Sequence, residues 1–144
     1  MIRPAQPADV DACVELLGTL FSIEQDFAPD PERQRNGLLM LINSPGAVLV
    51  AEKDQRVVAM VTCQVLISTA EGGPVGILED MVVAAAYRGR GIGSELLSSL
   101  ATWARGAGLS RLQLLADRDN LAALDFYLKH AWDQTSLIAL RLHP

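Results

Sequence analysis

Arginine and glycine residues cluster between residues 88 and 93, where the sequence reads Arg-Gly-Arg-Gly-Ile-Gly. A hydrophobic segment typical of a strand ends near Val83, and an amphipathic segment typical of a helix begins at Gly91. Glycines let the backbone pass close to a ligand, and the first amides of a helix have no partner within that helix. These amides lie at the positive end of the helix dipole, and Arg88 and Arg90 add two full charges. The segment therefore predicts an anion site, with a phosphate or pyrophosphate as its natural ligand.

Two common phosphate-binding patterns fit this segment poorly. A P-loop needs a Gly-Lys-Ser/Thr ending, and the chain contains no Gly-Lys pair. The dinucleotide-binding pattern has the spacing G-x-G-x-x-G after the first strand of a β-α-β unit, whereas the glycines here are spaced G-x-G-x-G after an antiparallel region. A glycine-rich turn with solvated arginines remains the alternative to a ligand site.

The segments around this loop predict one α/β (α+β) domain over residues 1–144. Strand patterns at residues 2–3, 47–52, 56–68 and 75–83, separated by short turns, predict a mostly antiparallel sheet. Helix patterns begin at Pro7 and cover residues 31–42, 91–106 and 120–130. Leu112–Ala116 predicts a strand parallel to Val75–Val83 through a right-handed crossover, and Thr135–Leu142 predicts a closing strand. The expected architecture is a mixed sheet flanked by helices, with one parallel β-α-β unit at the loop.

The composition excludes several classes of protein. Of the 144 residues, 50% are hydrophobic and 20% are charged, which excludes a disordered chain. A net charge of −5 argues against binding to nucleic-acid backbone, and no apolar run approaches the ~20 residues of a membrane-spanning helix. The first residues contain no apolar signal core, so we expect a cytoplasmic protein. Cys13 and Cys63 predict buried thiols rather than a disulfide framework, and no metal is expected.

The loop and a motif near the C-terminus together resemble a known family. Arg88–Gly93 matches the R/Q-x-x-G-x-G/A motif of the GNAT superfamily of N-acetyltransferases, and Asn120–Tyr127 resembles its N-x-x-A-x-x-F-Y motif. The order of elements agrees as well, so the resemblance covers nearly the whole chain. The stretch Leu78–Glu95 is also similar to polyamine and thialysine acetyltransferases. Ala131-Trp132 departs from the family's usual Gly-Phe, which affects the turn before the final strand.

The resemblance implies a GNAT-like fold that binds acetyl-CoA as cosubstrate. Backbone amides of the loop and the first helical turn would hold the pyrophosphate, and the residues concerned are Arg88, Gly89, Arg90, Gly91, Ile92, Gly93 and Ser94. Backbone groups of Met81, Val82 and Val83 would pair with the pantetheine arm like an added strand, at a splay between the fourth and fifth strands. Asn120 would contact CoA, and an N-cap role at the start of the last helix is equally natural for it.

The resemblance also implies direct transfer of the acetyl group to an amine. A primary ammonium has a pKa near 10.4, so removing its proton at pH 7 costs about 4–5 kcal/mol and needs a base or a water chain. Glu79 is the candidate base, acting directly or, as in polyamine acetyltransferases, through water, because apolar neighbours on its strand would raise the pKa of its carboxylate. Asp80 would point to the opposite face of the strand, where it would bind a cationic substrate or cap a turn. A structural ion pair is the alternative for both acidic residues. Tyr127 is the candidate acid for the departing thiolate, with packing beside Phe126 as the alternative.

The expected acceptor is a primary amine on a small molecule, such as a diamine or an amino-acid-like amine. Glu24, in the region of the family's acceptor loop, would attract the amine or belong to a solvated acidic loop. The alternatives are a protein acetyltransferase that acts on an N-terminus or a lysine, and a CoA-binding regulatory module without catalysis. We expect a homodimer whose interface Thr135–Leu142 would supply, and no nucleic-acid or membrane partner.

Overall fold

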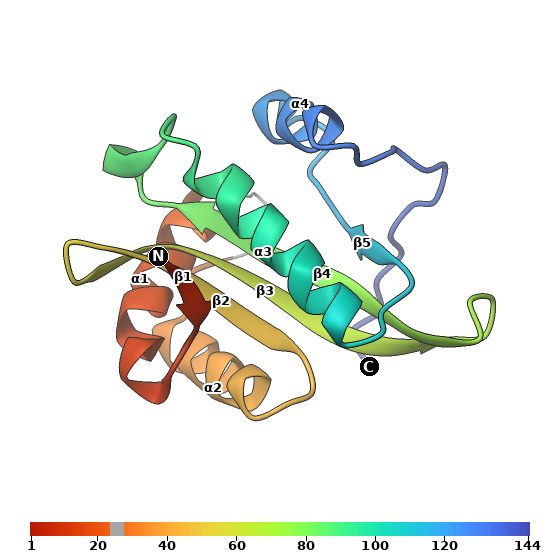
Figure 1. The fold of residues 1–144 in the computed structure, drawn as a ribbon, viewed down its shortest axis with the longest axis horizontal. Coiled ribbons are helices and arrows are strands. Elements are labelled where there is room, and N and C mark those ends of the chain that lie inside the picture. The colour runs from red at the N-terminus through yellow and green to blue at the C-terminus, as the bar shows by residue number, and fades with distance from the viewer. Residues whose placement is uncertain (24–27) are drawn as a thin grey trace. The chain divides into compact units, whose positions relative to one another are not determined.

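The computed structural model describes residues 1–23 and 28–144. These residues form two compact units, Met1–Leu114 and Leu115–Pro144, and each is described by itself. The first unit contains the sheet, the helices packed on it and the glycine-arginine loop, and the second contains the last helix (Figure 1).

Five strands of the first unit form one mixed sheet in the order β1-β2-β3-β4-β5. They are β1 (Ile2–Pro4), β2 (Ala47–Lys53), β3 (Arg56–Ser68), β4 (Gly73–Val83) and β5 (Leu112–Leu114). Neighbouring strands pair antiparallel except β4 and β5, which run parallel, as the sequence predicts. Asp54 and Gln55 have φ angles of 49° and 63°, so a tight turn of two left-handed residues joins β2 to β3.

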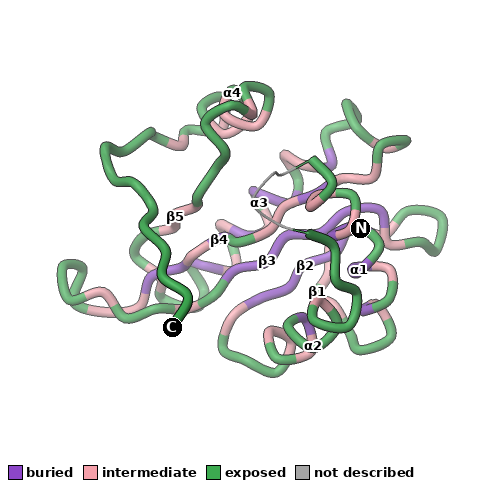
Figure 2. The backbone as a smooth tube through the Cα atoms, turned by 180° about the vertical axis from the view of Figure 1, so that it is seen from behind, coloured by how far each residue is buried: buried purple, intermediate pink, exposed green. Residues whose placement is uncertain are grey.

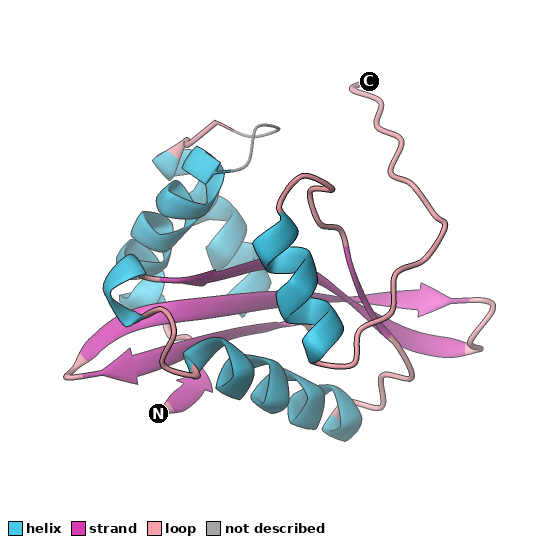
Figure 3. Ribbon diagram, turned by 90° about the horizontal axis from the view of Figure 1, so that it is seen from above, coloured by secondary structure: helices cyan, strands magenta, loops and turns pink. Residues whose placement is uncertain are grey.

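Helices cover both faces of this sheet. The helix α1 (Val10–Ile23) follows a 3-10 turn, η1 (Pro7–Asp9), and packs with α2 (Pro31–Ile42) on one face, whereas α3 (Ile92–Gly106) lies on the other (Figure 3). The buried residues of α1 recur at helical spacing and contact buried residues of the central strands. This part of the core contains Val10, Cys13, Val14, Leu16, Leu17, Leu38, Val48, Val50, Met60 and Val82. Burial is accordingly densest along β2, β3 and β4 (Figure 2).

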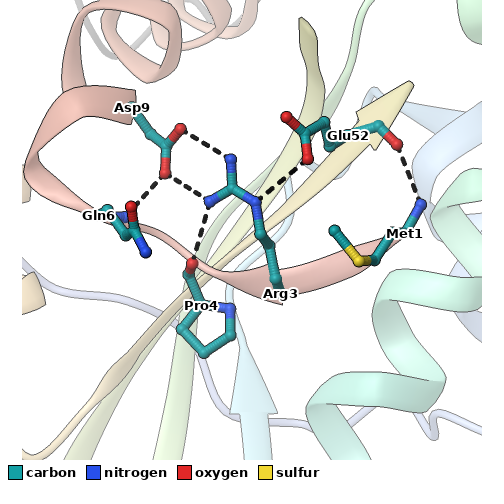
Figure 4. Close-up of polar contacts among 6 residues, drawn as sticks. All are labelled: Met1, Arg3, Pro4, Gln6, Asp9 and Glu52. Atoms are coloured by element: carbon teal, nitrogen blue, oxygen red, sulfur yellow. Dashed lines mark hydrogen bonds and ion pairs between the residues drawn. The ribbon is translucent and has the colours of Figure 1, made fainter. Parts of the chain in front are cut away.

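Polar contacts join the first strand to β2 and to the 3-10 turn before α1 (Figure 4). The Arg3 guanidinium donates to both carboxylate oxygens of Asp9, at 2.7 and 3.0 Å, and its Nε donates to Glu52 at 3.4 Å. Asp9 also accepts the backbone N–H of Gln6 at 2.8 Å. The Arg3 hydrogen bonds, assisted by the Gln6 amide, keep the pKa of the Asp9 carboxyl below its ordinary value. One arginine therefore ties the edge strand β1 to both the 3-10 turn before α1 and the neighbouring strand β2.

The second unit contains the helix α4 (Leu121–Lys129). The predicted closing strand over Thr135–Leu142 is wrong, because these residues are exposed and have no regular secondary structure. The backbone N–H of Leu137 donates to the Thr135 hydroxyl at 3.3 Å, a local contact that competes with a sheet ladder. The strand predicted over Leu112–Ala116 also ends early, at Leu114. Apolar, β-prone composition forms a strand only where a neighbouring strand supplies hydrogen bonds.

Candidate functional site

The predicted anion loop lies between β4 and α3 and contains two left-handed glycines. A 3-10 turn, η2 (Ala85–Tyr87), leads into it. Gly89 has a φ of +73° and Gly91 a φ of +82°, a conformation that costs other residues roughly 1–2 kcal/mol. Gly91 is the N-cap of α3, and its carbonyl accepts the backbone N–H of Glu95 at 3.1 Å. The helix α3 has 15 residues, so its first backbone amides lie at the positive end of a long helix dipole. The loop before them is exposed, and the two features together suit an anion.

Both arginines of the loop make contacts beside it. The Arg88 Nε donates to the carbonyl of Val83 at 3.0 Å, which ties the loop to the end of β4. The Arg90 guanidinium lies over the Tyr87 ring, with 5.2 Å between Cζ and the ring centroid. A small surface pocket beside this pair is lined by Lys53, Asp54, Tyr87, Arg90 and Ile92. The loop thus presents two guanidinium charges near the helix start, which fits a pyrophosphate.

The end of β4 extends beyond its ladder with β5. On the β3 side, the backbone is paired throughout this stretch, with Met81, Val82 and Val83 opposite Val61, Met60 and Ala59. On the β5 side, the parallel register of the described strands joins Gly76–Leu78 to Leu112–Leu114 and does not continue past Leu78. This geometry agrees with the splay that the resemblance implies between the fourth and fifth strands. It provides strand-like backbone next to the loop, where an extended ligand with amide groups can pair.

A β-bulge interrupts the pairing of β3 with β4 at the same place. Between two regularly paired positions, β3 contains one residue, Thr62, whereas β4 contains two, Glu79 and Asp80. The Thr62 hydroxyl donates to Asp80 Oδ2 at 2.8 Å and accepts the backbone N–H of Asp80 at 3.1 Å. Bulges of this kind redirect side chains, and they are frequent next to active sites.

The two acidic side chains of the bulge have different environments. Glu79 is exposed, whereas Asp80 is partly buried and bonded to Thr62. Burial raises the pKa of the Asp80 carboxyl to about 6, against the lowering effect of the Thr62 hydroxyl, and the Glu79 charge raises it further. The expectation that Glu79 is the desolvated carboxylate is therefore wrong. That expectation assumed regular alternation of faces along β4, and the bulge breaks this alternation.

Asn120 caps the first turn of α4 in the second unit. Its Oδ1 accepts the backbone N–H of Ala123 at 3.2 Å, and its carbonyl accepts the N–H of Leu124 at 3.1 Å. The N-cap role that the sequence predicts for Asn120 is thus confirmed. Its contact with CoA stays a prediction.

Tyr127, also in the second unit, packs among aromatic rings. Its ring centroid is 5.4 Å from that of Phe126 and 5.7 Å from that of Trp132, both in edge-to-face geometry. Its carbonyl accepts the backbone N–H groups of His130 and Trp132 at 3.0 and 3.1 Å, which closes the helix. Ala131 has a φ of +66°, the conformation that suits the glycine usual in the family. The packing role is confirmed, and the acid role stays a prediction.

Several further predictions concern residues away from the loop. Glu24 lies outside the residues that the structure describes. Cys13 and Cys63 are buried free thiols, as predicted. In the described ranges 1–23 and 28–144, no group of three or more His, Cys, Asp or Glu residues is placed to hold a metal ion. The described helices are all too short or too polar to cross a membrane.

Thr62 is a residue of the site that the sequence analysis missed. Its side chain is fully buried in the centre of β3 and bonded to Asp80. The signal available was a threonine within the apolar run VVAMVTCQV. Threonine is common in strands, so this position alone did not indicate chemistry.

In the first unit, the structure brings together three of the predicted groups of residues at the carboxyl end of β4. They are the acidic pair Glu79 and Asp80, the strand backbone of Met81–Val83 and the loop Arg88–Ser94. Asn120 and Tyr127 belong to the second unit. The first unit by itself thus offers a loop suited to an anion, an extended backbone and two carboxylates within one short segment.

Comparison with known proteins points to one family. The model of the acetyltransferase (GNAT) family matches residues 10–132. The uncharacterized N-acetyltransferase YobR of Bacillus subtilis (strain 168) is 39% identical over 54 residues, a match that spans 38% of this chain and only 22% of that relative. A putative acetyltransferase from Agrobacterium tumefaciens str. C58 is 23% identical with a TM-score of 0.83, covering 100% of this chain and 99% of that chain. An aminoglycoside antibiotic 6′-N-acetyltransferase from Acinetobacter haemolyticus is 20% identical with a TM-score of 0.84. The match covers 100% of this chain and 98% of that chain.

The structural likenesses, at these identities, establish the fold. The family match covers the loop, the β4 bulge and the Asn120–Tyr127 motif in one stretch. The chain therefore belongs to the GNAT family of acetyltransferases.

Proposed function

We propose that this chain is an N-acetyltransferase that moves the acetyl group of acetyl-CoA to a primary amine on a small molecule. The observation that carries the proposal is the loop of left-handed glycines at the start of α3, next to strand backbone beyond the β5 ladder. Members of the family use acetyl-CoA as cosubstrate. The loop suits its pyrophosphate, and the strand backbone suits its amide-bearing arm.

In this proposal, the first unit holds both polar parts of the cosubstrate. Backbone amides from Arg88 to Ser94 bind the pyrophosphate, and Met81–Val83 pair with the arm. The bond from Arg88 to the Val83 carbonyl supports this arrangement, because it holds the loop against the strand end. Asn120 contributes from the start of α4. When bound, acetyl-CoA supplies the thioester that is the reactive group.

The amine side is assigned to carboxylates. Removing a proton from a primary ammonium at pH 7 costs about 4–5 kcal/mol, so the site must take up that proton. Asp80 contacts the ammonium, and the exposed Glu79 passes protons to solvent through water. Glu24 is assigned to the acceptor side as well. Tyr127 donates a proton or a hydrogen bond to the departing sulfur, because a free thiol has a pKa near 8.5.

The choice of a small amine has two supports. The Glu79–Asp80 pair on β4 and the net charge of −5 favour a cationic acceptor. The structural neighbour from Acinetobacter haemolyticus is described as acting on an aminoglycoside antibiotic, a small polyamine in chemical terms. A protein N-terminus or lysine is the second class of acceptor, since the chemistry at nitrogen is the same.

We further propose that the protein is a cytoplasmic homodimer. The support for a second copy is the exposed apolar segment near the C-terminus, which contains Leu137, Ile138, Leu140 and Leu142. The buried free thiols agree with a reducing compartment. Sedimentation velocity of the wild-type chain and of a variant with serine at these four positions tests the dimer, which the variant should lose.

The test of the cosubstrate site is thermal unfolding with and without acetyl-CoA. At about 100 times the dissociation constant, the ligand should add about 2.7 kcal/mol, which is roughly 8 °C at about 3 °C per kcal/mol for a chain of this size. Gly91→Asp combined with Arg88→Ala should abolish the shift, because it adds a negative charge to the loop and removes a positive one. Gly106→Asp, which adds the same charge at the other end of α3, is the matched control and should keep the shift.

An acceptor screen follows on the protein that binds. It begins with diamines, continues with amino-acid-like amines and aminoglycosides, and ends with peptides that offer an α-amine or a lysine. Free CoA released in step with acetylated product identifies the acceptor class. Absence of any thermal shift at millimolar acetyl-CoA would contradict the cosubstrate proposal, and binding without product from any amine would contradict the enzymatic one.

A further inference from the structure

The outer ends of β3 and β4 form a two-stranded arm, in which residues 64–68 pair with residues 73–77 (Figure 1). The strand β2 does not reach this arm, because its first residue, Ala47, lies opposite Cys63. Among the residues that the structure describes, no strand pairs with residues 64–68 on the side where β2 would continue. These residues of β3 are therefore a free edge of the sheet, which we call the arm edge.

Two residues of the arm edge direct their backbone groups away from β4. Pro74 has no N–H, and its carbonyl and the N–H of Gly76 bond to the segment just before β5, at 3.2 and 2.8 Å. The backbone groups of Pro74 and Gly76 thus point away from β3. Opposite residues of an antiparallel pair point either both towards each other or both away. Ile67 and Val65, which lie opposite Pro74 and Gly76, therefore direct their N–H and C=O groups to the free side.

The side chains of the arm edge are uncharged and partly apolar. Leu66 is 48% exposed and Ile67 is 77% exposed. The segment reads Gln-Val-Leu-Ile-Ser and contains no charged residue and no proline. Nothing in its side chains therefore hinders pairing with another strand.

The arm edge is complementary to a second copy of itself. In an antiparallel pair centred on Leu66, Val65 lies opposite the partner's Ile67, and Gln64 lies opposite the partner's Ser68. Apolar side chains then contact apolar ones, and the amide side chain meets the hydroxyl. The residues with free backbone groups face each other in this register, so the N–H and C=O groups of Val65 and Ile67 all find partners in both copies.

The length of the arm edge suits the same register. The strand β3 ends at Ser68, where the chain turns back, and the N–H of Gly72 donates to the Ser68 carbonyl at 2.9 Å. The edge begins at Gln64, directly after the last residue that pairs with β2. A pair centred on Leu66 places the first residue of one edge opposite the last residue of the other. The partner's turn then begins where β2 takes over, and any other register leaves backbone groups unpaired or meets β2.

We propose that the arm edge is an interface with a second copy of this chain, in which two arms pair antiparallel about Leu66 and join two sheets into one. The inference rests on the homodimer of the proposed function and not on the acetyl transfer. A short strand pair buries less than the roughly 800 Å² per partner of a standard interface. The C-terminal apolar segment proposed above is therefore a second contact of the same dimer.

Disulfide formation at position 66 tests the register directly. Opposite residues whose backbone groups point away from each other have Cα atoms about 4.5 Å apart, a separation that allows a disulfide. Leu66→Cys should form a covalent dimer with oxidised glutathione, seen on a non-reducing gel. Ile67→Cys is the matched control and should remain monomeric on the gel, because its opposite residue is the partner's Val65. The native thiols of Cys13 and Cys63 are buried and should not react.

Charges at position 66 test the interface in solution. Leu66→Lys and Leu66→Glu each place like charges opposite each other and remove an apolar contact. Each should raise the dissociation constant of the dimer, measured by sedimentation velocity, by roughly 10-fold or more. An equimolar mixture of the two should associate again, because lysine then faces glutamate. Met40→Lys, at a position on α2 that is 75% exposed, is the control and should keep the wild-type constant. An unchanged thermal shift with acetyl-CoA shows that each variant is folded.

The outcomes separate this inference from the proposals beside it. Unchanged association of Leu66→Lys and Leu66→Glu overturns the arm interface and leaves the homodimer to the C-terminal segment. Crosslinking of Leu66→Cys no faster than that of Ile67→Cys, or a mixture of the charged variants that does not associate, overturns the register about Leu66 and with it the inference. A wild-type chain that is monomeric at every concentration overturns the homodimer and this inference together, and the acetyl-CoA thermal shift still decides the cosubstrate proposal.

Discussion

Replacing Asp80 by asparagine should raise the free energy of unfolding at neutral pH, and the increase should be much smaller at acidic pH. In the folded chain the pKa of Asp80 is raised from 3.8 to about 6, so the folded state binds this proton more tightly than the unfolded state. The free energy of unfolding therefore falls as the pH rises from about 4 to about 6, and it stays lower above that range. A rise of about two pKa units means that ionising Asp80 lowers the free energy of unfolding by about 3 kcal/mol in total. About 1 kcal/mol of this decrease has already occurred at pH 4.5.

Asparagine is a close probe of this effect. It stays neutral at each pH, and its amide oxygen can accept the Thr62 hydroxyl as Asp80 does at 2.8 Å. Urea denaturation of both proteins should give a gain of about 3 kcal/mol at pH 7.5 and about 1 kcal/mol at pH 4.5. Glu15→Gln should change the free energy of unfolding by less than about 0.5 kcal/mol at either pH. An equal gain at the two pH values, or a loss at pH 7.5, would refute the reasoning, because neither result follows from a desolvated carboxylate.

Three glycine and alanine positions give further tests by denaturation. Gly76→Ala would place a methyl group 2.6 Å from Leu112 Cδ2 and 2.8 Å from Cys63 Sγ, and should cost about 1–3 kcal/mol in urea titrations. Gly91→Ala, at a φ of +82°, should lower the free energy of unfolding by about 1–2 kcal/mol. It should also reduce the thermal shift with acetyl-CoA, and an unchanged shift would show that the loop takes no part in binding acetyl-CoA. Ala131→Gly, at a φ of +66°, should raise the midpoint of unfolding by relieving about 1 kcal/mol, and a lower midpoint would contradict this.

The elements that carry the site follow from sequence periodicity. The bounds of β3, Arg56–Ser68, and of α2, Pro31–Ile42, match the prediction at both ends, because turn residues enclose an uninterrupted pattern in each. The helix α3 begins one residue later than predicted, since Gly91 is its cap. The anion loop was predictable for the same reason: glycines, arginines and a helix start are adjacent in the chain.

The chemistry of the acidic pair was not predictable from local sequence. Its environment depends on the register between two strands, and Thr62 is 18 residues away from Asp80. Nothing in the sequence marks the extra residue in β4, so the exposure of Glu79 and the burial of Asp80 could not be predicted from composition. The strand prediction for Thr135–Leu142 was wrong for a related reason. Its composition suits a strand, but strand formation is a property of two segments, and one segment alone cannot reveal it.

The short strand β1 protects the sheet edge against aggregation. β2 contains five consecutive buried residues, Ala47–Ala51, and such a run at the edge of a sheet would be a template for pairing between molecules. β1 covers Leu49–Ala51 with three residues, and it ends at Pro4, which has no N–H to offer a further strand. Arg3 adds a charge to this edge and is locked by Asp9 and Glu52. Detaching β1 would thus expose an aggregation-prone surface at the edge of the sheet opposite β5, and Arg3 protects solubility as well as stability.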